Sequence, residues 1–168
     1  MSFSLFLWRI LPLVFIISFL KGFINVLWKV KFLDIYTAFA LSLIVLVDLN
    51  FYSLLTLFIL GILRGFEGNY PFFFFSIYYL LFMLFNHYYF KQFFKKDSLI
   101  PLFLFWSLAI IVLISGETIF FLYRSVVYNL TFKFWLFFLL KSLLYGFIIL
   151  ILTSLFYKLG KRFIVLEE

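Results

Sequence analysis

The sequence contains 168 residues, of which 67% are hydrophobic, 27% are aromatic and only 12% are charged. A soluble domain has roughly 45–50% apolar and about 25% charged residues, so this composition excludes a soluble enzyme, a nucleic-acid-binding domain and a secreted disulfide scaffold. A soluble chain of this length also has too little interior to bury 30 Phe and 11 Tyr residues. The composition therefore predicts a polytopic membrane protein.

Cysteine is absent, which excludes a disulfide framework, a thiolate metal site and a cysteine nucleophile. The formal net charge is +7, and the basic residues flank apolar segments. That placement is typical of topology signals and of contact with anionic lipid. The first residues lack both a basic region and a small-residue cleavage site, so we expect the first apolar segment to remain as a span.

Apolar runs interrupted by charged residues, glycine, proline or asparagine predict an all-α bundle of six transmembrane helices in one domain. The first run ends at Lys21-Gly22, and we expect residues 23–32 to form an interfacial continuation rather than a span. The second run is short, so its ends are expected within the headgroup layer. The expected spans are residues 3–20, 34–48, 51–66, 72–90, 99–123 and 134–157.

Basic clusters predict how the bundle is oriented. Residues 91–96 and 158–162 contain the densest clusters, and two expected spans separate them, so they lie on one face of the membrane. The positive-inside rule assigns that face to the cytoplasm, which places the N- and C-termini there as well. The lysines within residues 21–31 then fall on the outer side and oppose this assignment.

Asp34 and Asp48 are the two acidic residues of the second expected span. At 1.5 Å per residue, a helix separates them by about 21 Å. Two carboxylates that act on one substrate lie roughly 5–10 Å apart, so a catalytic dyad is excluded here. Because both residues, like Lys91, are close to span ends, we expect them to anchor the chain at the membrane interface.

Arg64 and Glu67 are three residues apart, so a helical turn would place them side by side. Gly61, Gly65 and Gly68 surround them and permit close backbone approach or a break in the helix. This segment is either the tightest part of the bundle or a surface turn with a weak ion pair.

Glu117 and Arg124 are seven residues apart and share one face of the fifth expected span, about 10 Å apart. Lys141 lies seven residues into the sixth span, shares a face with Tyr145, and would reach Glu117 if these helices are antiparallel neighbours. That contact would serve either as a structural ion pair or in binding a ligand or partner. The candidate partner or cavity residues are Asp34, Arg64, Glu67, Glu117, Arg124 and Lys141.

Motifs that carry catalysis are absent from the sequence. It contains no glycine-rich phosphate loop, no nucleophile elbow and no His-Glu pair at metal spacing. The single histidine, His87, makes a poor metal site without cysteine or clustered carboxylates, and packing in an aromatic belt explains it better. We therefore expect no enzymatic activity, no cofactor and no metal.

Residues 33–104 show a characteristic order of features. An acid opens a span at Leu33-Asp34, a short turn follows at Asp48-Leu49-Asn50, and a glycine-bearing span leads to a Gly-Pro segment between Gly61 and Pro71. The next span ends in a short basic loop that contains an acid, at 91–98. This order resembles the MreD family of rod shape-determining proteins. That family commonly has an Asp after the glycine of the third span, where this chain has Arg64-Gly65.

The resemblance implies a non-catalytic, multi-pass subunit of the bacterial inner (cytoplasmic) membrane that belongs to the elongasome. Such a protein binds an MreC-like partner and, through it, MreB, and supports lateral peptidoglycan synthesis beside RodA and a class B penicillin-binding protein.

Two alternatives stay open. In a substrate-binding S component of an energy-coupling-factor transporter, the charged residues near Arg64 and Glu117 would line a vitamin pocket. Residues 3–20, however, lack the Ala and Gly with which S components dock their transport partner. A lipid- or polyprenol-handling protein is suggested only by Lys141 and the aromatic content.

Overall fold

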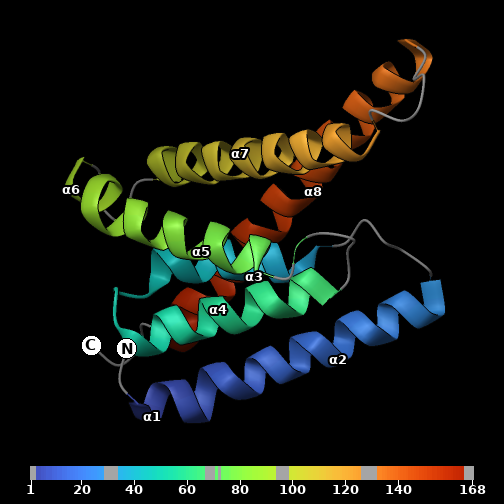
Figure 1. The fold of residues 1–168 in the computed structure, drawn as a ribbon. Coiled ribbons are helices and arrows are strands. Elements are labelled where there is room, and N and C mark those ends of the chain that lie inside the picture. The colour runs from blue at the N-terminus through green and yellow to red at the C-terminus, as the bar shows by residue number, and fades with distance from the viewer. Residues whose placement is uncertain are drawn as a thin grey trace.

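The computed structural model of the protein describes residues 3–28, 34–66, 71, 73–93, 99–125 and 132–164. These parts of the chain are helical and contain no β-strand, which confirms the all-helical prediction (Figure 1). They form six helical segments, each matching one expected span. The elements are α1 (Phe3–Leu5), η1 (Phe6–Ile10), α2 (Leu11–Trp28), α3 (Ile35–Leu46), α4 (Phe51–Phe66), α5 (Phe74–Phe85), η2 (Asn86–Phe90), α6 (Lys91–Phe93), α7 (Leu99–Ser125) and α8 (Phe132–Ile164), where η1 and η2 are single π-helical turns.

The first and the last helical segments extend furthest beyond the boundaries expected for their spans. The first span is expected to end at Lys21-Gly22 with an interfacial continuation, and α2 runs through these two residues to Trp28. Gly22 has open space around it, and a glycine inside a helix costs only about 1 kcal/mol relative to alanine. α8 continues to Ile164, so the basic residues within 158–162 lie on a helix, where cations near a carboxyl end are favoured by the helix dipole.

The α3 helix lies at the centre of the bundle. Every residue from Asp34 to Ile44 is buried, and the helix packs most extensively against α8. Its small residues Ala38 and Ala40 are fully covered. A helix that is apolar on all sides is typical of such a buried position, so the second predicted span is the core of the fold.

A tight turn joins α3 to α4 and fixes them as antiparallel neighbours. The Asn50 side chain accepts a hydrogen bond from the Ser53 backbone N–H at 2.9 Å. The Ser53 hydroxyl oxygen accepts one from the Asn50 N–H, also at 2.9 Å. This reciprocal pair is a capping box, which satisfies two backbone donors at the start of α4.

Consecutive long helices run in roughly opposite directions (Figure 1). The bundle has an ion pair near each end of α3, Asp34 with Arg64 and Asp48 with Lys91. We call these the Asp34 end and the Asp48 end. At the Asp48 end, Lys91 Nζ lies 2.7 Å from Asp48 Oδ1. The rings of Phe6 and Tyr52 stack there at 5.5 Å. The first helical residues and the carboxyl end of α8 both lie toward this end (Figure 1).

Within the described ranges, three helices are long and apolar enough to cross a membrane, over Phe6–Phe23, Ile100–Ile119 and Phe137–Arg162. Large apolar side chains are exposed along them, among them Phe15 and Phe147. The α3 and α4 helices have 12 and 16 residues, which correspond to about 18 and 24 Å. Since the hydrocarbon core of a bilayer is about 30 Å thick, these two helices are shorter than the core, and a crossing by either one requires flanking residues in the headgroup layer or a locally thinner bilayer.

Candidate functional site

Asp34 forms the centre of a polar network where α3 begins. It is the N-cap of that helix, and its Oδ1 accepts the Thr37 backbone N–H at 3.0 Å. The Thr37 hydroxyl donates to Asp34 Oδ2 at 2.7 Å. These bonds satisfy an otherwise unpaired helix donor and hold the carboxylate at the positive end of the helix dipole.

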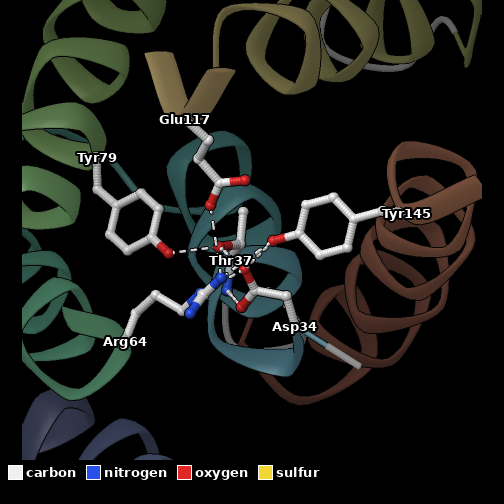
Figure 2. Close-up of polar contacts among 6 residues, drawn as sticks. All are labelled: Asp34, Thr37, Arg64, Tyr79, Glu117 and Tyr145. Atoms are coloured by element: carbon white, nitrogen blue, oxygen red, sulfur yellow. Dashed lines mark hydrogen bonds and ion pairs between the residues drawn. The ribbon is translucent and has the colours of Figure 1, made fainter. Parts of the chain in front are cut away.

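Arg64, near the carboxyl end of α4, neutralises this carboxylate. Its Nε lies 2.6 Å from Asp34 Oδ2, and its Nη2 donates to the Tyr145 hydroxyl of α8 at 3.2 Å. Tyr145 in turn donates to Asp34 Oδ2 at 2.7 Å. The three side chains thus form a closed triangle that joins α3, α4 and α8 (Figure 2).

The α5 helix contributes two aromatic side chains to the network. The Tyr79 hydroxyl lies 2.6 Å from Thr37 Oγ1. Because the single Thr37 hydroxyl hydrogen is directed to Asp34, which only accepts, Tyr79 is the donor in this contact. The Arg64 guanidinium carbon lies 4.6 Å from the centre of the Phe75 ring, within the range of a cation–π interaction.

Glu117 reaches the network from α7 but is held more weakly. Its Oε1 lies 3.6 Å from Arg64 Nη2, a distance that allows an ion pair but not a hydrogen bond. This oxygen is buried and has no hydrogen-bond partner among the described residues. Figure 2 shows the Glu117 side chain pointing from α7 toward the amino end of α3.

The structure brings together three of the six candidate residues, Asp34, Arg64 and Glu117. The expected pairing of Glu117 with Lys141 is wrong, because Glu117 pairs with Arg64 and the Lys141 side chain is exposed on α8. Glu67 lies outside the described residues, and so does the side chain of Arg124, although its backbone belongs to α7.

The expectation that Asp34 anchors the chain at the membrane interface is also wrong. Its side chain is only 2% exposed, because α3 lies inside the bundle and the partners of Asp34 come from neighbouring helices. Asp48, at the other end of α3, is 65% exposed and forms its ion pair with Lys91. It therefore matches the expected position at a helix end.

Besides Phe75, three hydrogen-bonding members of the network were not candidates from the sequence: Thr37, Tyr79 and Tyr145. Thr37 follows Asp34 by three residues, which is the spacing of a capping interaction, so a sequence signal for it existed. Tyr79 and Tyr145 are 42 and 111 residues away from their partners. No local pattern indicates contacts over such separations.

A second polar cluster lies at the Asp48 end. Asn86, the first residue of the π-helical turn η2, donates from Nδ2 to the Ile44 carbonyl at 2.7 Å. Lys91 Nζ donates to the Val47 carbonyl at 3.3 Å. His87 lies against Tyr88 with 5.0 Å between ring centres. The contacts of Asn86 and Lys91 attach η2 and the start of α6 to the carboxyl end of α3.

Most hydrogen-bond donors and acceptors of the Asp34 network bond to other members of the network. Within the described ranges no three His, Asp or Glu side chains are grouped as metal ligands. The arrangement therefore fixes helices α3, α4, α5 and α8 relative to one another, while Glu117 keeps unused acceptor capacity. Comparison with protein-family models, with curated proteins and with solved structures found no match for this chain.

Proposed function

We propose that the chain is a non-enzymatic subunit of the bacterial cell-shape machinery that binds an MreC-like partner. In this proposal it crosses the inner membrane six times, with both termini in the cytoplasm. RodA and a class B penicillin-binding protein are further partners of the same assembly.

The observation that carries the proposal is the Asp34 network in the interior of the bundle. Asp34 receives bonds from Thr37, Arg64 and Tyr145, so side chains of three helices are fixed around one buried carboxylate. Buried polar networks whose members are satisfied make a helix packing rigid and unique. A rigid bundle with apolar flanks suits a scaffold that binds other membrane proteins helix to helix.

The experiment is a pull-down of the tagged full-length protein from its native membrane in mild detergent. Mass spectrometry then identifies the proteins and the small molecules that are retained, and an unrelated tagged six-span protein serves as the matched control. Enrichment of an MreC-like protein over this control supports the proposal. Its absence from repeated preparations of folded protein contradicts the proposal.

A second candidate function follows from the convergence of Arg64 and Glu117, which lie 3.6 Å apart near one end of the bundle. If the chain were an S component of a vitamin transporter, these residues would line its outward-facing pocket. The same pull-down separates the two candidates, because recovery of ATPase subunits or of a bound vitamin favours the S component.

A further inference from the structure

Among the side chains that the structure describes, the charges of the Asp34 network do not balance. Its described ionisable side chains are the two carboxylates of Asp34 and Glu117 and the single guanidinium of Arg64 (Figure 2). With all three ionised, the cluster carries one excess negative charge. Burying an uncompensated charge is costly, so buried charges are normally paired.

Asp34 is the carboxylate that the network satisfies. It accepts the Thr37 N–H and hydroxyl at 3.0 and 2.7 Å. It also accepts the Tyr145 hydroxyl at 2.7 Å and Arg64 Nε at 2.6 Å. Three of these donors reach Oδ2 and one reaches Oδ1, so both oxygens of Asp34 are hydrogen-bonded. The positive charge of Arg64 is therefore directed mainly to Asp34.

Glu117 is the carboxylate that the network leaves unsatisfied. It has one ionic contact, at 3.6 Å, and no donor to its buried Oε1. Its side chain is 15% exposed, against 2% for Asp34. The residues next to it on α7, Gly116 and Thr118, are also only partly buried. The Glu117 carboxylate is therefore accessible to a group from outside the bundle.

We propose that a basic side chain of the partner's membrane segment, an ammonium or a guanidinium group, binds Glu117 and completes the network. This inference rests on the proposed function and names the chemistry by which the partner is recognised. A cationic donor supplies the missing positive charge and the hydrogen bond that Glu117 lacks. Lys and Arg side chains are long enough to bury an apolar stem along α7 while their head groups reach the carboxylate.

The test compares variants of the tagged full-length protein in the pull-down described above. Glu117→Gln removes the charge and keeps the shape, and Asp48→Asn removes an exposed carboxylate at the opposite end as the matched control. We expect Glu117→Gln to reduce the recovered partner at least tenfold, and Asp48→Asn to leave it unchanged. Equal amounts of folded protein, verified by circular dichroism, enter each pull-down.

A charge exchange then identifies the contact. Replacing the partner's basic membrane residue with Glu should abolish recovery by the wild-type chain, and Glu117→Lys should restore it. Undiminished recovery by Glu117→Gln, or no restoration by any exchange, overturns the inference while the proposed function stands. Retention of an amino lipid in a Glu117-dependent manner, without a protein, also overturns it. Glu117-dependent recovery of a partner unlike MreC keeps the contact and rejects the cell-shape role.

Discussion

Replacing Arg64 with methionine tests the central contact of the bundle. The change removes the cation that faces Asp34 and Glu117 and keeps an apolar side chain that still packs on Phe75. The Asp34 carboxylate, 2% exposed and 2.6 Å from Arg64 Nε, is then buried without a counter-charge. We expect the free energy of unfolding to fall substantially.

The size of the loss follows from the separate contacts of Arg64. Breaking a buried ion pair by removing one partner costs about 3–5 kcal/mol. The cation–π contact with Phe75 adds about 0.5–2 kcal/mol. A hydrogen bond between membrane helices, as with Tyr145, adds only about 0.6 kcal/mol on average. The unpaired Asp34 makes the largest contribution, and the three contributions together predict a loss of about 4–8 kcal/mol.

Reversible unfolding of the purified protein in mixed micelles, followed by circular dichroism, measures this loss. The double variant Asp34→Asn with Arg64→Met should regain most of it, because the remaining carboxylate, Glu117, is partly exposed. Asp48→Asn, which removes the exposed partner of Lys91, is the control and should cost less than about 1 kcal/mol. A loss below about 0.5 kcal/mol for Arg64→Met would refute the reasoning, because surface substitutions lie within that range.

Three further substitutions test the packing and the network by the same unfolding measurement. Gly61→Ala places a methyl group against the α5 backbone and should lower the free energy of unfolding by about 1–3 kcal/mol. Gly22→Ala, in open space, is its control and should be neutral or stabilising. Equal effects of the two substitutions would contradict the close approach of α4 and α5 at Gly61. Tyr145→Phe removes bonds to two network members and should cost about 1 kcal/mol, whereas Tyr88→Phe on the surface should not. Thr37→Val should cost about 1–3 kcal/mol because it leaves a buried tyrosine hydroxyl without its acceptor, and Thr37→Ser should restore most of this.

The helices could be predicted from the sequence because each one is a local pattern. Apolar runs with charged or small residues between them indicated six helical segments, and the chain forms them in the same order. At Lys21-Gly22, where the first span is expected to end, Gly22 has open space around it and the helix continues, so the end of an apolar run is not the end of the helix. That all six segments cross the membrane, and in which orientation, stays a prediction.

The partner of Asp34 could not be predicted because it depends on how helices pack. Arg64 is 30 residues away, and the apolar surfaces between the two residues are nearly uniform in sequence. The packing is decided by features such as the bare backbone of Gly61 against Ser76, which brings α4 and α5 together and aligns Arg64 with Phe75. Sequence spacing instead paired Arg64 with its neighbour Glu67, the interaction that a single helix would allow.

The interpretation of Asp34 as an interfacial anchor failed because it treated every span as an independent crossing. The α3 helix has 12 residues and covers about 18 Å, whereas α7 and α8 have 27 and 33 residues and cover about 40 and 50 Å. Tyr145 lies within the long apolar stretch Phe137–Arg162, so the end of a short helix meets the middle of a long one. A charge at the end of a span is therefore not necessarily near water, and the depth of Asp34 is set by the helices that surround it.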